Sequence, residues 1–501
     1  MLKKILFISS FCLLVLSNSF AQISYNPYSY QQYHRYGAKI YGDSLVQHTA
    51  VKPYIGAALD GKDMVEDRDS SQNWFIRKIF QEHLVEVKKD DHSFYLDFMP
   101  DMLVGKQFGS VSKNLWNNTR GMQLGLQIKD KFTLYSNFFE NQAIPASYIY
   151  DMAEANSAVP GQGTYKKYKT DGLDWMNATA NMTYAFSRKL QLSLAYDKVH
   201  IGEGYRSMLL SDNSFNFSHV KVSGEVGKLQ YNSIWAFMND RMNPKEADVN
   251  NPENTRIGDG VKYAAFQYVD YNVTDNFSAG GFLSTVWTTL GESAERKINS
   301  NYGLNLKYLP LQQLVVYGQL LAEDSKFNRL GFQLGAKTFD LFEVPRLNLT
   351  MEYNQATPYT YQSRNNRVNY SNHGEALAHP RGANFKEFLG IATYNWRRFD
   401  IYFQGLYSKY GQDPNNGVNF GGNIFKEQMP DNPSYTTGQG QAVDLLYLES
   451  RFAYVLNPKY NLRVELGLIR RQQQIEDIGK RNNTIVSFGL RSSFRQFYTD
   501  F

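Results

Sequence analysis

Two absences narrow the class of this 501-residue protein. The only cysteine, Cys12, lies within the apolar run 5–16, and no cysteine follows it. A disulfide framework, a thiolate zinc site and a cysteine nucleophile are therefore excluded from the rest of the chain. No stretch after Ala21 approaches the roughly 20 consecutive apolar residues of a membrane-spanning helix, which excludes a helical membrane protein.

The chain also lacks a strong charge of either sign. It has 53 basic and 48 acidic side chains, a formal net charge of +5. Lys3 and Lys4 precede the apolar run, and Ser19, Phe20 and Ala21 end in a small residue, as in a secretory signal peptide. We expect residues 1–21 to be that signal peptide. Without its two lysines the charge is +3 (51 minus 48), too weak to indicate nucleic-acid binding.

What recurs along the chain is alternation of apolar and polar residues over about ten residues, the length of a tilted strand in an outer membrane. In residues 122–130, Met122, Leu124 and Leu126 share one face, and Gln123 and Gln127 share the other. The same pattern recurs in 190–198, 346–354 and 460–468. With 42% hydrophobic and 15% aromatic residues, the composition is that of a folded protein.

Alternation alone does not distinguish a secreted soluble β-sandwich from a membrane barrel. Three features favour the barrel: the signal peptide, the charged residues on the polar faces, and aromatic residues near strand ends, as in interfacial girdles. These aromatic residues are Phe138, Phe139, Tyr271, Trp396, Tyr407 and Tyr447. About eighteen segments of this kind lie between residues 93 and 493. We predict an all-β fold, a large antiparallel transmembrane β-barrel of about 18 strands.

The region before the first strand has a different character. Residues 22–53 are rich in tyrosine and do not alternate, whereas 74–88 has the pattern of an amphipathic helix with Phe75, Ile79 and Val87 on one face. We expect this helix to plug the barrel, with a small periplasmic appendage as the alternative. The predicted organisation is a signal peptide (1–21), an N-terminal periplasmic or plug segment (22–90) and the barrel (91–501).

Four long irregular stretches rich in Pro, Gly and Asn interrupt the strands: 141–175, 239–260, 355–384 and 409–441. Barrels of this type have short periplasmic turns and long extracellular loops. We therefore expect these stretches to lie outside the cell or to fold back into the lumen, and to carry recognition. Arg495 and Thr499 break the alternation before Phe501, which suggests that the tail extends past the last strand.

The segment 202–213 combines a Gly-x-Gly spacing with polar residues, but it opens no helix, which argues against a dinucleotide loop. Two interpretations of it remain open. Its polar side chains can bind sugar hydroxyls, or the segment is a loop that folds into the barrel and pairs Arg206 with an acid on the wall. His200, Ser207 and Asp212 are the only local trio that resembles a hydrolase site, and no nucleophile motif accompanies them.

The segment 373–387 is the densest polar stretch. His373 and His379 flank Glu375, but Pro380 and Gly382 break the regular spacing that a metal site needs. Carbohydrate contact or a structural cap on the lumen is the better interpretation. We predict no metal, no cofactor and no enzymatic activity.

The segment 202–213 resembles the signature region of the Wzi-like capsule assembly family of outer-membrane proteins. Residues 372–387 look like a second block of that family, and 74–88 followed by 93–98 looks like the family's passage into its barrel. The resemblance covers most of the chain after residue 21. It implies an eighteen-stranded barrel with an N-terminal helical plug, acting as a lectin that attaches exported polysaccharide. The Tyr- and Asn-rich composition is similar to the RemB-like branch linked to gliding motility.

These observations predict a non-enzymatic protein in the outer membrane of a Gram-negative bacterium that binds and anchors exported surface polysaccharide. The predicted partners are that polysaccharide, outer-membrane lipid, and proteins of polysaccharide export or gliding, but not nucleic acid. Two rivals remain, a gliding-motility or secretion accessory protein and a diffusion porin. The predicted polysaccharide-binding residues are Glu203, Tyr205, Arg206, Asp212, Asn213, His373, His379, Arg381, Asn384 and Glu387.

Overall fold

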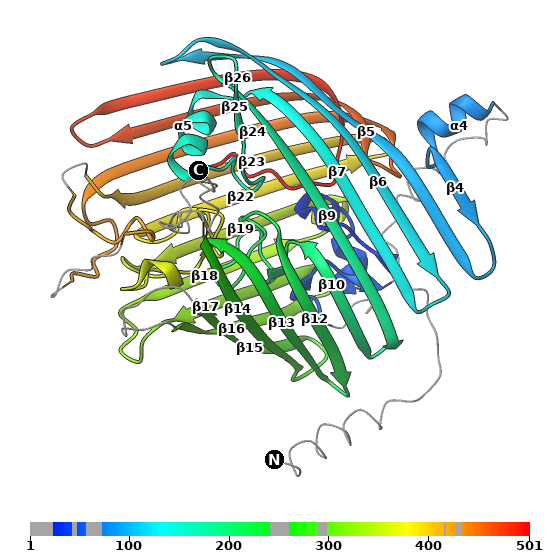
Figure 1. Cartoon of the computed structure of the whole chain (residues 1–501), viewed down its shortest axis with the longest axis horizontal. Coiled ribbons are helices and arrows are strands. Elements are labelled where there is room, and N and C mark those ends of the chain that lie inside the picture. Colours follow the sequence, from blue (N-terminus) through cyan, green and yellow to red (C-terminus); the bar gives the residue numbers. More distant parts are fainter. Residues whose placement is uncertain are drawn as a thin grey trace, which may run out of the picture.

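A closed β-barrel dominates the computed structural model, which describes residues 24–42, 48–56, 73–240, 260–288, 298–414, 417–426 and 433–501. Eighteen antiparallel strands form the wall (Figure 1), as the alternation predicts. They are β5 (His92–Gly109), β6 (Lys113–Ile128), β7 (Phe132–Ile144), β9 (Gly172–Ser187), β10 (Leu190–Asp197), β12 (Phe217–Val226), β13 (Leu229–Asp240), β14 (Gly260–Asn272), β15 (Phe277–Trp287), β16 (Ile298–Leu311), β17 (Leu314–Ala322), β18 (Leu330–Thr338), β19 (Leu347–Ala356), β22 (Phe385–Trp396), β23 (Phe399–Gln412), β24 (Gln441–Asn457), β25 (Leu462–Ile475) and β26 (Gly479–Ser492).

The barrel closes where the last strand meets the first. β26 pairs with β5 from Asn483↔Gly109 to Leu490↔Met102. A short strand, β8 (Lys166–Tyr168), extends the edge of β9. No helix in the described part of the chain has both the length and the apolar character needed to cross a bilayer.

The two faces of the strands distinguish a membrane barrel from a soluble sandwich. Met122 is 50% exposed and its neighbour Gln123 is 2% exposed, while Met351 is 46% and Glu352 is 1% exposed. Apolar side chains therefore point outward and polar ones inward, the reverse of a soluble core. The outward apolar side chains, called the outer belt below, include Phe98, Met122, Phe138, Met182, Leu194, Val220, Phe237, Val269, Leu283, Leu304, Leu334, Met351, Phe388, Phe403, Leu446, Leu466 and Val486.

The expectation that aromatic residues form girdles holds only in part. Tyr271, Trp396 and Tyr407 are exposed on the outside of the wall. Phe139 and Tyr447 instead belong to the opposite strand face and are buried inside the barrel. The reason is the two-residue period of a strand, which sends neighbours such as Phe138 and Phe139 to opposite faces.

The two ends of the barrel have different connections. Short turns at one end include 129–131, 188–189, 227–228 and 397–398. The other end carries the long connections 145–171, 198–216, 357–384 and 413–440. This difference matches the periplasmic and extracellular ends of outer-membrane barrels, and the two are called the short-turn end and the loop end.

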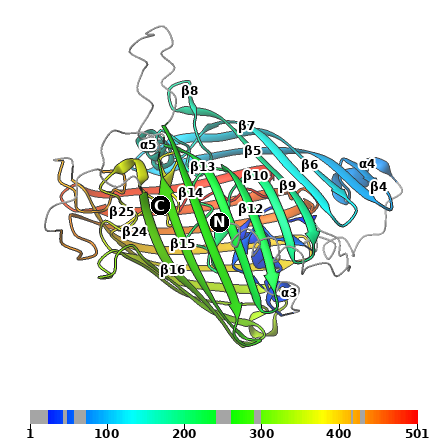
Figure 2. The ribbon, with the colours of Figure 1, turned by 60° about the horizontal axis from the view of Figure 1, so that its bottom comes forward.

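Four segments fill the lumen (Figures 1 and 2). The first, called the N-terminal segment below, comprises residues 24–42 and 48–56, with helices α2 (Tyr30–Arg35) and α3 (Gly37–Gly42) and a pair of short strands, β1 (Ser24–Tyr25) and β3 (Ile55–Gly56). In the second, the connection 198–216, strand β11 (His200–Ile201) pairs with β2 (Val51–Lys52) of the first. The third is the connection 357–384, with η4 (Asn366–Val368), β20 (Ser371–Asn372) and β21 (Glu375–Ala376). The fourth is the C-terminal tail 493–501.

Apolar contacts join these segments to the wall. Met208 and Leu209 of the second segment pack in one cluster with Leu377 of the third and with Phe266 and Phe282 of the wall. The stretch 355–384 therefore folds back into the lumen, one of the two expected positions. The tail leaves β26 at Ser492 and lies inside the barrel, which confirms that it extends past the last strand.

The expected stretches at the loop end differ from the structure in detail. Within 141–175, β7 continues to Ile144, β9 begins at Gly172, and helix α5 (Ser147–Asn156) lies between them. The stretch 409–441 begins with the end of β23, and its residues 415–416 and 427–432 lie outside the described residues. Most of the stretch 239–260, residues 241–259, also lies outside them. At the other, short-turn end, a short 3-10 helix, η3 (Leu341–Glu343), connects β18 to β19.

The structure corrects the prediction that residues 74–88 form a helix that plugs the barrel. Helix α4 covers only Trp74–Phe80, and strand β4 (Val85–Lys88) follows and pairs with β5. Both lie at the short-turn end outside the lumen (Figure 1). The inner wall is polar, so the tyrosine-rich N-terminal segment (24–42 and 48–56), whose rings carry hydroxyl groups, occupies the interior in place of the apolar helix.

A charge placed in the outer belt provides a test of the membrane-facing surface. We expect Leu466→Arg, in the middle of the outer face of β25, to lower the free energy of unfolding by about 2–4 kcal/mol. Leu311→Arg, at a short turn, should cost about 0–1 kcal/mol, because the side chain can reach the interface. Urea unfolding in phospholipid vesicles measures both, and equal small losses would contradict a lipid-facing belt.

Candidate functional site

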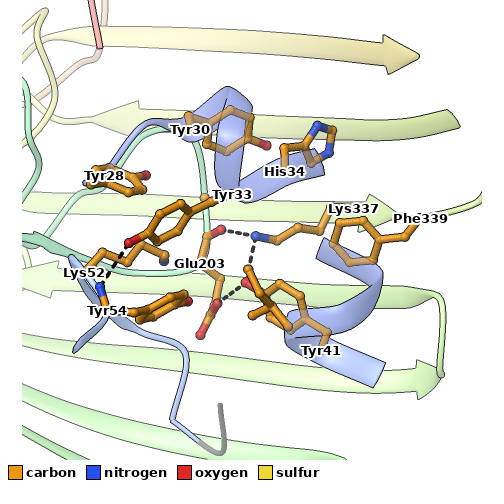
Figure 3. A pocket seen from close by; sticks show the side chains of 12 residues that line it. Tyr28, Tyr30, Tyr33, His34, Tyr41, Lys52, Tyr54, Glu203, Lys337 and Phe339 are labelled. Carbon is orange, nitrogen blue, oxygen red and sulfur yellow. Dashed lines mark hydrogen bonds between the residues drawn. The ribbon is translucent and has the colours of Figure 1, made fainter. Parts of the chain in front are cut away.

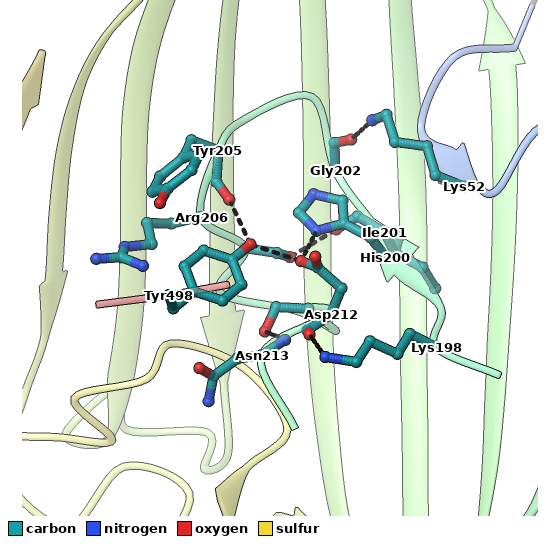
Figure 4. Close-up of polar contacts among 12 residues, drawn as sticks. Lys52, Lys198, His200, Ile201, Gly202, Tyr205, Arg206, Asp212, Asn213 and Tyr498 are labelled. Carbon is teal, nitrogen blue, oxygen red and sulfur yellow. Dashed lines mark hydrogen bonds and ion pairs between the residues drawn. The ribbon is translucent and has the colours of Figure 1, made fainter. Parts of the chain in front are cut away.

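The two polar motifs of the sequence meet inside the barrel at Arg206. Its Nη2 lies 2.8 Å from Asp500 Oδ2 of the tail, and its Nε donates to Glu387 Oε1 of β22 at 3.3 Å. The guanidinium also lies 5.0 Å and 5.2 Å from the ring centres of Tyr205 and Tyr498 (Figure 4). Arg206 therefore holds the connection 198–216 to both the wall and the tail, which agrees with the interpretation of an inward-folded loop.

Glu387 also binds His379 of the second motif. His379 Nε2 donates to Glu387 Oε1 at 3.0 Å, and its Nδ1 accepts from the backbone N–H of Arg381 at 3.2 Å. Burial lowers the pKa of His379, which favours the neutral ring that these two bonds require. Arg206, His379 and Glu387 thus form one buried network in which the donor and the acceptor of each hydrogen bond are defined.

Asp212 lies at a second junction with the tail. It accepts from the Tyr498 hydroxyl at 2.7 Å and lies 3.3 Å from His200 Nδ1 (Figure 4). Ser207, the third member of the local trio, instead donates its hydroxyl to the Ile201 carbonyl at 2.6 Å. The trio is therefore a set of structural contacts and lacks the serine–histidine bond that a hydrolase needs.

Glu203 joins the connection 198–216 to the N-terminal segment. Its carboxylate accepts from the Tyr41 hydroxyl, and its carbonyl accepts from Lys337 (Figure 3). The carboxylate also accepts from the Thr49 hydroxyl at 2.6 Å. Burial alone raises the pKa of Glu203, but the surrounding lysines, Lys52 foremost, lower it to about 2. Glu203 is therefore ionised, and its negative charge neutralises part of the positive charge of the surrounding lysines.

Glycine is required next to Glu203. Gly202 has a φ of +145°, and a Cβ at that position would lie 2.2 Å from Nε2 of the Gln319 side chain. Its carbonyl accepts from the Lys52 ammonium. The Gly-x-Gly spacing thus serves close packing of the loop inside the barrel.

The remaining predicted residues lie apart from the Arg206 network. Asn213 Nδ2 donates to the Ala376 carbonyl at 3.3 Å, and the His373 ring meets Phe215 edge-on at 5.1 Å. Asn384 Nδ2 donates to the carbonyls of Gly411 and Gln439 at the base of the loop end. Apart from Arg381, every predicted site residue is buried.

Arg381 lines a cavity of about 500 Å³ at the loop end. Its guanidinium stacks on the Tyr410 ring at 4.0 Å, and Arg471 lies over the Tyr148 ring at 4.6 Å. Arg481 is a third arginine in the lining, and the lining residues include one carboxylate, Asp151. This arrangement, called the arginine cavity below, is open to a ligand with negative charge or several hydroxyls.

The Arg381 guanidinium lines the cavity, but two of its nitrogen atoms are buried within the protein. Its Nε and Nη2 have no hydrogen-bond partner among the described residues. Arg471 is more constrained, because its Nε donates to the main-chain oxygen of Phe501 at 3.1 Å and its Nη1 donates to Gln473. The tail therefore positions one side of the cavity.

A second cavity, of about 270 Å³, runs along the inner wall beside the tail. Five of its six charged lining residues bind one another: Arg463 and Arg491 both contact Glu465, at 2.8 Å and 2.9 Å, and Arg451 contacts Glu449 at 3.1 Å. The sixth, Arg495, donates to the side chains of Asn141 and Gln162. These carboxylates and guanidinium groups are already paired. The arginine cavity is the better candidate for a ligand site.

Sequence reasoning missed several residues of this region. Arg471 and Arg481 lie on a strand and at a strand start, with no local motif around them. Tyr498 and Asp500 were recognised only as part of an irregular tail. The only sequence pattern that pointed to Tyr498 and Asp500 was the loss of apolar–polar alternation before Phe501. A tail that leaves the wall must satisfy its polar groups elsewhere.

No group of three or more His, Cys, Asp or Glu side chains within the described ranges is arranged to hold a metal ion. His373 and His379, the pair weighed as metal ligands, have separate partners, Phe215 and Glu387.

Comparisons with known proteins show what this fold resembles. The structure matches that of Wzi from Escherichia coli, an outer-membrane protein that is involved in group 1 capsule assembly and is a carbohydrate-binding β-barrel. The match has a TM-score of 0.53 and 11% identity, and it covers 94% of this chain and 100% of Wzi. OccAB4 from Acinetobacter baumannii (TM-score 0.42, 10% identity, 80% and 98% covered) is also similar. So is OprD from Pseudomonas aeruginosa (0.43, 11%, 79% and 94%).

No protein family description and no curated protein matches the sequence. At 11% identity, the similarity to Wzi shows the fold alone. The chain therefore has the fold of a large outer-membrane β-barrel.

Removing Arg206 tests the buried network. We expect Arg206→Met to lower the free energy of unfolding by about 3–5 kcal/mol, because it leaves Glu387 and Asp500 buried without their cation. The double variant with Asp500→Asn should lose less than the sum of the two single variants. Urea unfolding measures these losses, with Arg364→Met, which removes an exposed arginine of the connection 357–384, as control. A loss from Arg206→Met as small as that of the control would contradict the network.

Proposed function

We propose that this chain is a Gram-negative outer-membrane protein that binds exported surface polysaccharide at its loop end and anchors it there without catalysis. The arginine cavity is the observation that carries the proposal. It combines three guanidinium groups with the rings of Tyr148 and Tyr410 and one carboxylate at the end of the barrel that carries the long connections.

The chemistry of this cavity suits a sugar chain. Guanidinium groups bind carboxylates and phosphates through paired N–H donors, and they also bind sugar hydroxyls. Tyrosine rings offer flat apolar surfaces beside these donors. Arg381 lines the cavity, and its buried Nε and Nη2 have no hydrogen-bond partner among the described residues, so Arg381 is the proposed direct contact.

In this proposal the other predicted site residues do not touch the polysaccharide; they hold the residues of the arginine cavity in place. Arg206, His379 and Glu387 fix the segment that leads to Arg381, and the tail that bears Phe501 fixes Arg471. A rigid support of this kind reduces the ordering cost of binding. Glu203, Tyr205, Asp212, Asn213, His373 and Asn384 hold the inward-folded segments together and are proposed as positioning residues.

Two rivals share the fold. The four segments in the lumen favour a binding protein over a diffusion porin, because they occupy the space through which solutes would pass. A gliding-motility or secretion accessory protein would differ in its partner proteins, and polysaccharide-export or gliding proteins are therefore also candidate partners. Wzi, whose fold is similar, is a carbohydrate-binding β-barrel, which supports the proposal of polysaccharide binding.

Loss of charge in the arginine cavity tests polysaccharide anchoring. In a strain carrying Arg381→Gln with Arg481→Gln, we expect surface polysaccharide to move from the cell-bound to the released fraction at constant total. The loss of two charge-assisted contacts should weaken binding about tenfold or more. The matched control is Lys326→Gln, which removes an exposed charge at the loop end outside the cavity.

The two fractions, quantified with surface motility scored in parallel, separate the rivals. An unchanged distribution in a strain that displays the double variant at normal levels would contradict anchoring by the arginine cavity. A motility defect with unchanged polysaccharide would favour the gliding role.

Conductance in planar bilayers tests the porin rival. We expect no steady ion conductance from the purified full chain, because residues 24–42 and 48–56, the two inward connections and the tail lie in the lumen. A variant lacking residues 24–56 should conduct if it inserts. Steady conductance of the unaltered protein would contradict the closed lumen and favour a diffusion porin.

A further inference from the structure

The seam of the barrel is incomplete toward the short-turn end. β26 pairs with β5 only as far as Met102, and Pro100, which has no N–H, follows two residues nearer the short-turn end. Below this point β4 takes the free edge of β5, with Val85 opposite Leu96 and Val87 opposite Phe94. β4 therefore continues the wall past its seam.

The apolar face of β4 continues the outer belt in register. Leu96 and Phe94 lie opposite Leu124 and Leu126 of β6, and Phe98 lies opposite Met122, a member of the outer belt. Residues directly opposite in antiparallel strands share a face. Val85 and Val87 thus lie on the side of the sheet that faces lipid in the rest of the barrel.

Helix α4 adds a larger apolar surface beside this strand. Trp74, Phe75, Ile76 and Ile79 are all exposed, Phe75 at 68%. The basic side chains of the helix point to a different partner, since Arg77 and Lys78 both contact Glu82 at 2.9 Å. Four exposed large apolar side chains in seven residues need a cover other than water.

Polar contacts hold the helix in place at the rim. Asn457 Nδ2 donates to the carbonyls of Lys78 and Glu82 at 3.0 Å and 2.9 Å, and Arg398 donates to the Phe80 carbonyl at 3.2 Å. Asn457 is the last residue of β24, and Arg398 lies in the short turn 397–398. The helix is therefore fixed at the periplasmic edge of the barrel, beside β4 (Figures 1 and 2).

We propose that α4 and β4 form a flange that lies in the periplasmic leaflet of the outer membrane and contacts its lipid. Lipid is the occupant because the apolar face of the flange is continuous with the outer belt. Aromatic side chains beside basic residues are also typical of helices that lie in a membrane interface. The inference rests on the outer-membrane location in the proposed function and adds a lipid-binding element outside the barrel wall.

A single fluorescent label tests the flange, since the chain has no cysteine after residue 21. Phe75→Cys and Ile79→Cys, each labelled with an environment-sensitive dye, are reconstituted as the full chain in nanodiscs. We expect nitroxide-bearing lipids to quench both labels about twofold, most strongly with the nitroxide about 5–10 Å below the headgroups. Asp90→Cys, in the exposed turn after β4, should remain unquenched.

Met122→Cys in the outer belt distinguishes two failures. If Met122 is quenched and positions 75 and 79 are not, the flange inference is wrong while the membrane location stands. If Met122 is also unquenched, the membrane location and the proposed function fail. A label at 75 that is shielded from water but not quenched by lipid would assign the surface to a protein partner and overturn the inference.

Discussion

Charge neutralisation inside the lumen is the constraint on which the rest of this structure depends. The wall presents polar and charged side chains inward, and such groups must be paired once water is displaced. Arg206 satisfies Glu387 of the wall and Asp500 of the tail together. Through these contacts one side chain connects an inward loop, the wall and the end of the chain.

Similar pairings hold the other segments. Glu203 is bound by the N-terminal segment and by lysines of the wall, and Tyr25 donates its hydroxyl to Asp197 at 2.6 Å. The lumen therefore folds as one polar core in which each segment supplies partners for the others. Removal of any segment would leave buried charges on its neighbours, so the inward segments depend on one another.

This core supports the proposed recognition surface. The arginine cavity lies where Arg381, held through His379, meets Arg471, held through Phe501. The proposed binding surface thus depends on contacts deep in the lumen. At the short-turn end, the polar groups of α4 and β4 bind the rim of the barrel. Their apolar groups extend the outer belt.

The sequence alone determined the wall. Alternation such as that of Met122 and Gln123 depends only on the two-residue period of a strand, so strand number, class and the outward apolar face could be predicted. Arg206 paired with a wall acid was also foreseen as one of two interpretations. Only the tertiary structure decided which segments fill the lumen, why the helix at Trp74 lies outside it, and that Arg471 and Arg481 join Arg381. Those outcomes depend on pairing between residues hundreds of positions apart, such as Arg206 and Asp500, which no local pattern specifies.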